Sequence, residues 1–250
     1  MERPLKTFDS DREDAVKDWY EKIYKNLQSG RDKYRTMYLE KSEKSIRVNG
    51  DQCINIKLGN PYDCLGSIVK IGETPNDNIK ELNDLIVYYS HTILNYSVLP
   101  VTGGLNNIKW RLGSDRIDTF IFVLDQYYKG INQAVILNSG SSNGDIGTRN
   151  KLKEILDSFG SVDGFVSVIY GIDPITSEEF VKRAIDSGSK PILGIAGLCD
   201  YMNLAVDFWE LRFDMLLKSG VFKLGESKQK VVRDDFKSMR ERICQLSSSK

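Results

Sequence analysis

One stretch of the chain concentrates residue types that bind anions. Gly103 and Gly104 allow the backbone to turn and to approach a ligand closely. Asn106 and Asn107 follow, and their amides offer both hydrogen-bond donors and acceptors. The cationic residues after them lie near the start of an expected helix, where free N–H groups and the helix dipole favour an anion. The predicted ligand-binding residues are Gly103, Gly104, Asn106, Asn107, Lys109, Arg111 and Arg116.

Two carboxylates in the same stretch are the candidate catalytic residues. Asp115 and Asp118 lie in the first turn of a helix that is expected to begin after Ser114, a good N-cap residue. Asp118 could act as an acid, a base or a metal ligand, beside a guanidinium clamp from Arg111 or Arg116. Alternatively, both carboxylates complement the helix dipole and Arg116 pairs locally. The glycine spacing fits neither a Walker A loop nor a dinucleotide fingerprint, so the sequence names no cofactor.

The same residues carry a resemblance to a known family. The pattern is Pro100…Gly104…Asn106…Arg111…Asp115-Arg116-x-Asp118, followed by an apolar helix that ends at Tyr127-Tyr128. Residues 100–128 thus resemble the central segment of an uncharacterised bacterial family, described only as a domain of unknown function. Phe8-Asp9 and the helix around 201–213 fit the same pattern. The resemblance implies a bacterial, intracellular, single-domain protein with small β elements before its helices. It implies no activity, although such proteins often accompany mobile elements and defence genes.

Other residues that could do chemistry favour structural roles. His91 is the only histidine, and no arginine lies at the spacing that a HEPN-type ribonuclease motif requires. Asp207, Glu210 and Asp214 recur at helical spacing and could bind a divalent cation, but a solvated helix face is the plainer interpretation. The four cysteines show no two-residue spacing, which predicts reduced thiols rather than a zinc or redox site.

The composition excludes several classes of protein. The 250 residues include 35 Lys and Arg and 35 Asp and Glu, which excludes a generally cationic nucleic-acid coat or a polybasic membrane binder. No stretch reaches the ~20 apolar residues of a membrane span, and no apolar signal segment is recognised, so a cytoplasmic location is expected. Residues 218–250 nevertheless hold nine Lys and Arg against four Asp and Glu. This basic tail could contact an acidic partner or nucleic acid, although a solvated helix face explains it more simply.

Hydrophobic periodicity predicts the helices that would position these residues. They are expected over 11–28, 78–96, 114–128, 152–159, 176–188, 202–216 and 228–247. Thr176 and Glu179 form a capping-box pattern, which places a helix start at Thr176. The C-terminal helix, 228–247, is expected to be partly exposed.

Strand signals are confined to the first part of the chain. Asn49-Gly50 favours a tight turn between alternating segments at 46–48 and 54–58, and 67–71 is a further strand candidate. The short apolar run 134–137 fits either a strand or a buried helix, and 138–147 is expected to be an exposed loop. The expected fold is one α+β domain over residues 1–250. It is predominantly helical, with about seven helices and a small antiparallel sheet near the N-terminal third.

Two hypotheses about function follow from these patterns. The first is a non-catalytic interaction or regulatory component, which the resemblance connects with bacterial defence or mobile elements. The alternative is an enzyme or binding protein for a phosphate-bearing or nucleotide-like ligand, centred on residues 102–118. The expected partner is another protein or a small anionic ligand. Nucleic acid is not favoured, a membrane is excluded, and the oligomeric state is left open.

Overall fold

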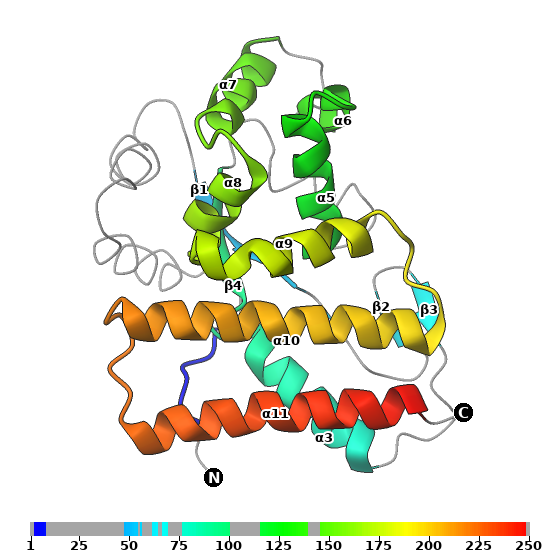
Figure 1. Cartoon of the computed structure of the whole chain (residues 1–250), viewed down its shortest axis with the longest axis vertical. Coiled ribbons are helices and arrows are strands. Elements are labelled where there is room, and N and C mark those ends of the chain that lie inside the picture. The colour runs from blue at the N-terminus through cyan, green and yellow to red at the C-terminus, as the bar shows by residue number, and fades with distance from the viewer. Residues whose placement is uncertain are drawn as a thin grey trace.

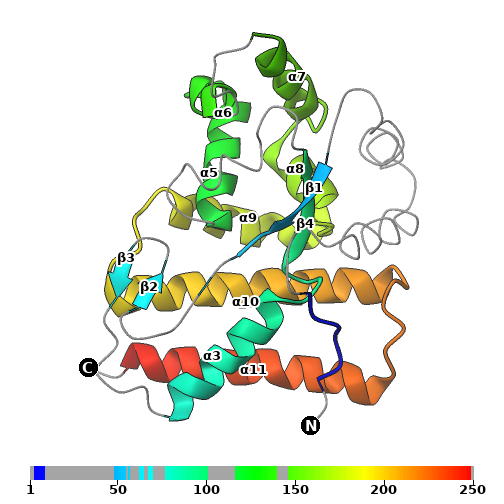
Figure 2. The same cartoon turned by 180° about the vertical axis from the view of Figure 1, so that it is seen from behind.

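The longest helix, α10 (Gly194–Lys218), runs through the middle of the fold (Figure 1). The computed structural model describes residues 3–8, 48–54, 56, 62–64, 67–69, 77–100, 116–139 and 146–248. On one side α10 packs against α9 (Pro174–Gly188), and on the other side it packs against α11 (Glu226–Ser248). Helix α3 (Asp77–Ser90) packs against α11, as the rear view in Figure 2 also shows.

The remaining described helices stand on the α9 side of α10. They are α5 (Ile117–Tyr128), α6 (Gln133–Ser139), α7 (Ile146–Asp157) and α8 (Val162–Ile169). Helix α5 packs against both α9 and α8, and this contact places the start of α5 beside the end of α9. The described part of the chain is therefore predominantly helical, as the sequence predicts. None of its helices is both long and apolar enough to cross a membrane.

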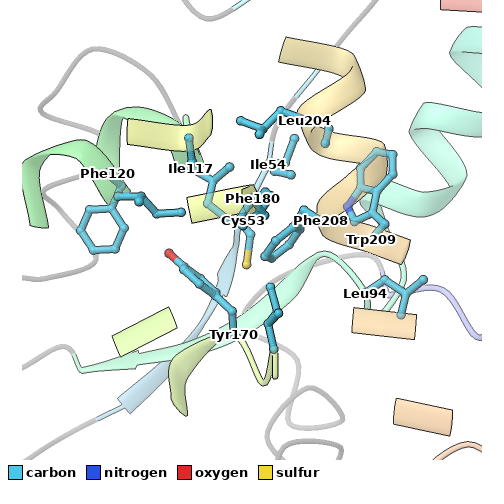
Figure 3. Close-up of a cluster of buried hydrophobic side chains, with 14 of the residues drawn as sticks. Cys53, Ile54, Leu94, Ile117, Phe120, Tyr170, Phe180, Leu204, Phe208 and Trp209 are labelled. Carbon is cyan, nitrogen blue, oxygen red and sulfur yellow. The ribbon is translucent and has the colours of Figure 1, made fainter. Parts of the chain in front are cut away.

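The hydrophobic core is densest along α10. Met202, Val206, Trp209, Phe213 and Leu216 are all buried, and their spacing places them along one stripe of the helix. Aromatic side chains from other elements meet this helix at ring distances typical of favourable pairs, as Figure 3 shows for Tyr170 and Phe180 around Phe208. The expected long buried helix over 202–216 is thus confirmed.

Two short antiparallel pairs form the β structure of the described residues. Strand β1 (Val48–Gln52) pairs with β4 (Tyr96–Pro100), and β2 (Tyr62–Cys64) pairs with β3 (Ser67–Val69). The predicted turn at Asn49-Gly50 is wrong, because both residues lie within β1, opposite Leu99 and Val98. The partner of β1 comes from a distant part of the chain, and this tertiary pairing overrides the local preference for a turn. The strand candidate at 67–71 is confirmed over β3.

Helix α3 ends earlier than the periodicity predicts. It stops at Ser90, whereas Ile93 lies in a turn and Tyr96 begins β4. Both residues are buried, so the same apolar spacing serves a helix, a turn and a strand in succession. The amides of His91 and Thr92 bond to carbonyls three residues back, which tightens the chain out of the helix.

A buried asparagine holds this turn to the rest of the fold. The Asn95 amide donates to the carbonyl oxygens of Ile54 (2.7 Å) and Ser90 (3.0 Å). Its Oδ1 accepts from the backbone N–H of Ile54 (3.1 Å) and from Nε1 of Trp209 (3.0 Å). Asn95 is fully buried and uses both donors and both acceptor positions, so it joins the segment after β1, the end of α3 and α10.

Several predicted helix starts are corrected by the structure. Helix α5 begins at Ile117 with Arg116 in the N-cap position, so Ser114 is not the cap. Helix α9 begins at Pro174, and its N-cap is Asp173 rather than Thr176, because the Asp173 carboxylate accepts from the N–H of Ile175. Proline at the first helical position fits this start, since its fixed φ suits a helix and its missing N–H would be unbonded there.

The ambiguous and loop-like segments after α5 also become clear. The run 134–137 lies in α6, which resolves it as helix. The expected exposed loop 138–147 is wrong at both ends, because residues 138 and 139 belong to α6 and residues 146 and 147 belong to α7. The expected helix 152–159 begins earlier, within α7, and Gly160 follows its end with a positive φ of 73°. Residues 140–145, like the expected helix 11–28, lie outside the described part.

Asp173 makes stability sensitive to acid. The N–H of Ile175, together with the ammonium group of Lys218, holds the pKa of Asp173 below its usual value. This stabilisation is complete above the unfolded-state pKa of about 3.9 and is lost as pH falls through the lower folded-state pKa. Below about pH 4, the Tm of the wild type should therefore fall more steeply than that of Asp173→Asn, whose amide still caps the helix. Parallel Tm profiles for the two proteins would contradict this role.

Candidate functional site

A cleft of about 490 Å³ lies between α9 and α10, next to the start of α5. One side, here called the α9 wall, is formed by residues of α9 and of the two positions after it. The α9 wall includes Lys182, Arg183, Asp186, Ser187 and Lys190. Gly197, Asp200, Asn203 and Leu204 of α10 form the facing wall, and Pro191 and Ile192 lie between the two helices. The volume lies in the range of pockets that bind small molecules.

Arg116 is the predicted ligand-binding residue that the structure places at this cleft. Its guanidinium forms a two-pronged ion pair with Asp118, with Nε to Oδ1 at 3.0 Å and Nη2 to Oδ2 at 2.6 Å. It also donates to the carbonyl oxygens of Lys190 (3.1 Å) and Ser187 (3.3 Å). These bonds leave one N–H of Nη1 without an acceptor among the described residues. The guanidinium carbon lies 5.5 Å from the ring centre of Tyr201.

The hydrogen-bonding positions of the Asp118 carboxylate are more completely filled than those of the Arg116 guanidinium. In addition to the two bonds from Arg116, its carboxylate accepts from the Ser187 hydroxyl (2.7 Å) and from the N–H of Thr119 (2.8 Å). These contacts fill the roughly four acceptor positions of a carboxylate, and the side chain is fully buried. The geometry therefore favours a structural role for Asp118 over the acid, base or metal-ligand role expected from the sequence. It matches the alternative in which Arg116 pairs locally.

The Arg116–Asp118 pair lies in a tight joint between α5 and α9. A Cβ added to Gly188 would lie 2.1 Å from the backbone oxygen of Asp118, far closer than any side chain can approach. Only glycine lets the end of α9 approach the start of α5 so closely. The two carbonyl groups that Arg116 binds, those of Ser187 and Lys190, belong to the same joint.

Most of the predicted site lies outside the described residues. This applies to Gly103, Gly104, Asn106, Asn107, Lys109, Arg111 and Asp115. Their roles in ligand binding and catalysis therefore stay predictions. The cations that line the cleft beside Arg116 come from the α9 wall and were not among the predicted residues.

The lysines of the α9 wall hold only exposed carboxylate partners. Lys182 pairs with Glu178, and Lys190 pairs with Asp186; both pairs lie four residues apart on the surface. Their side chains are 62–73% exposed, so water screens these pairs and they contribute little to stability. The hydrogen bond that Lys182 donates to Glu178, assisted by the opposite charge, raises the pKa of Lys182. Both ammonium groups can turn toward a ligand at small cost.

Other candidates for chemistry have structural explanations. Burial, with a contribution from Asp200, raises the pKa of Cys199 to about 11, so this thiol stays protonated and unreactive at neutral pH. His91 lies beyond the end of α3 and bonds through Nδ1 to the Val87 carbonyl (2.7 Å). Across the described ranges, no group of three or more His, Cys, Asp or Glu side chains could hold a metal ion.

The acidic side chains of α10 form ion pairs with arginines of the basic tail. Arg240 of α11 pairs with both Asp207 and Glu210 of α10, and Arg233 pairs with Asp214. The solvated-face interpretation of the three carboxylates is therefore incomplete, because they join α10 to α11. Farther along α11, Arg242 pairs with Glu81 of α3. Part of the excess positive charge of the tail thus meets acidic residues of its own chain.

Comparisons with known proteins assign no family to this chain. No family model matches it, and neither a curated protein nor a solved structure is similar to it. The cleft and the groups that line it are therefore the features of the described residues that bear on function.

Proposed function

We propose that the protein is a non-catalytic binding or regulatory component that takes a small phosphate-bearing anion into the α9–α10 cleft. The observation that carries this proposal is the gathering of Arg116, Lys182, Arg183 and Lys190 around one cavity. Cationic side chains that converge on a concave site attract and hold phosphate groups, both through charge and through directed hydrogen bonds.

The state of two neighbouring groups, Asp118 and Cys199, gives no support for catalysis by either of them. The Asp118 carboxylate has no acceptor position left for a proton or a metal ion. The Cys199 thiol, next to Asp200 in the chain, is protonated at neutral pH. General acid–base and nucleophilic mechanisms both need a group that can exchange a proton or attack within reach of the ligand. Neither of these two groups meets that need.

Calorimetric titration of the full chain with inorganic phosphate tests the proposal. Lys190→Ala should weaken phosphate binding about tenfold, because a hydrogen bond from a charged donor is lost. Lys237→Ala is the matched control, since Lys237 is also an exposed lysine paired four residues away, but on α11. Its affinity should equal that of the wild type. The proposal fails if the wild type does not bind phosphate, or if both variants bind it equally well.

The biological setting belongs to the same proposal. The resemblance of residues 100–128 to an uncharacterised bacterial family supports a cytoplasmic bacterial protein, and the frequent occurrence of such uncharacterised proteins beside defence and mobile-element genes suggests where its partners lie. A regulatory protein in such a system would change its interactions with another protein when the cleft is occupied.

A further inference from the structure

The two walls of the cleft differ in charge. The α9 wall, together with Arg116, supplies the cations that line it. The wall from α10 supplies Asp200 and Asn203 and no cation among the described lining residues. Gly197, Asp200 and Leu204 follow one another at helical spacing, so they share one face of α10. A ligand in the cleft would therefore meet three cations and the Lys190-paired Asp186 on the α9 wall, and the Asp200 carboxylate and the Asn203 amide on the facing wall.

Asp200 stands out among the carboxylates near the cleft. Each exposed cation on the α9 wall already pairs with a different acid, namely Glu178, Asp207 or Asp186. Asp200 is exposed, and no cation of the described residues pairs with it, although several line the same cavity. Asn203 on the same wall is half-buried, and its amide can both donate and accept. These two side chains can bind hydroxyl groups that a ligand brings with it.

A carboxylate in this position also restricts the ligand. An ionised carboxylate only accepts hydrogen bonds, so it binds O–H or N–H donors and repels a second anionic group. The cleft is roomier than a single phosphate requires, because its volume is about 490 Å³. A phosphate at the cationic wall leaves space for the molecule to which it is esterified.

We infer that the cleft recognises a phosphate ester of a hydroxylated molecule, with the phosphate on the α9 wall and vicinal hydroxyls on Asp200 and Asn203. This inference rests on the proposed function and adds the class of ligand. Ribose 5-phosphate carries the required chemistry in its simplest form. The same group occurs in free sugar phosphates and in nucleoside monophosphates.

Titration of the full chain with ribose 5-phosphate and with inorganic phosphate tests the inference. The wild type should bind ribose 5-phosphate about tenfold more tightly than phosphate, because the sugar hydroxyls bond to a charged acceptor. Asp200→Ala should remove this preference while leaving the affinity for phosphate unchanged or higher. Asp214→Ala is the matched control, since Asp214 is an exposed carboxylate on the same helix but away from the cleft. It should keep the preference.

The possible outcomes separate the two proposals. If the wild type binds both compounds equally, or if Asp200→Ala keeps the preference, the inference is overturned and the proposed function stands. If neither compound binds, the proposed function itself fails. A parallel titration with adenosine 5′-monophosphate separates the two sources, since tighter binding than that of ribose 5-phosphate would indicate a nucleotide.

Discussion

Replacing Asp118 by alanine is expected to destabilise the fold by about 3–5 kcal/mol, because it leaves the buried guanidinium of Arg116 without a counter-charge. Arg116 is only 7% exposed, so little solvent reaches its guanidinium to compensate for the missing carboxylate. The substitution also removes the acceptor of the Ser187 hydroxyl and of the Thr119 N–H. Urea unfolding followed by circular dichroism measures the loss.

A double-mutant cycle measures how much the pairing of Arg116 with Asp118 contributes to stability, and so tests whether the pair is structural. The variant that combines Arg116→Met with Asp118→Ala removes both charges, so it should be more stable than the sum of the two single losses predicts. The exposed pair of Lys237 with Glu241 on α11 offers the comparison, since Lys237→Ala should change stability by less than about 1 kcal/mol. An Asp118→Ala protein as stable as the wild type would contradict the structural role.

Asn95→Ala is expected to cost at least about 3 kcal/mol, since each buried polar group that is left without a partner costs about 1–3 kcal/mol. The substitution leaves both backbone groups of Ile54 and the indole N–H of Trp209 without partners, and it leaves the Ser90 carbonyl with the Gln52 amide as its side-chain donor. Asn95 holds the segment after β1, the end of α3 and α10 together, so its loss should weaken all three segments in one unfolding transition. Thermal unfolding monitored by Trp fluorescence would record the change.

The control for this prediction is an asparagine on the surface. Asn138 is exposed at the end of α6, so Asn138→Ala should alter stability by no more than about 0.5 kcal/mol. Asn95→Asp adds a sharper comparison, because it keeps both acceptor positions and removes both donors. It places a carboxylate oxygen against the carbonyl oxygens of Ile54 and Ser90 in a fully buried position, so it should be at least as destabilising as Asn95→Ala. Equal stability of Asn95→Ala and Asn138→Ala would show that the buried network contributes little.

The parts of the fold that follow from apolar spacing alone are those with a strong helical stripe. The spacing of Met202, Val206, Trp209, Phe213 and Leu216 predicts a long buried helix, and all five residues are buried in α10. Arg212 on the same helix could not be predicted as buried. Its acceptors include the carbonyl oxygens of Ile93 and Tyr96, which lie 119 and 116 residues earlier in the sequence.

Errors arose where a distant partner decided the structure. Asn49-Gly50 has the local chemistry of a turn, but pairing with β4 holds it in a strand.

The sequence does not predict helix α8, for a different reason. Its eight residues are too few for a distinctive periodic pattern, although Ser161 caps the helix as an N-cap residue should.

The geometry of the candidate site also depends on residues that lie far apart in the sequence. The sequence offers local pairing of Arg116 as one of two alternatives but cannot decide between them, because the carbonyl groups of Ser187 and Lys190 that complete the arrangement lie 71 and 74 residues farther along the chain. Lys182, Arg183 and Lys190 carry a usable signal, since they cluster in and just after the last half of α9. These cations face Asp200 across the cleft because the short connection between α9 and α10 sets the angle between the two helices. Local sequence patterns do not predict that interhelical angle.

Heteronuclear NMR of the full chain during titration with ribose 5-phosphate tests the central claim most directly. Backbone amide signals of residues 182–190 and 197–204 should move as the ligand is added, and the signals of α11 should stay in place. Signals that move only in α11, or that do not move at all, would contradict a phosphate site between α9 and α10.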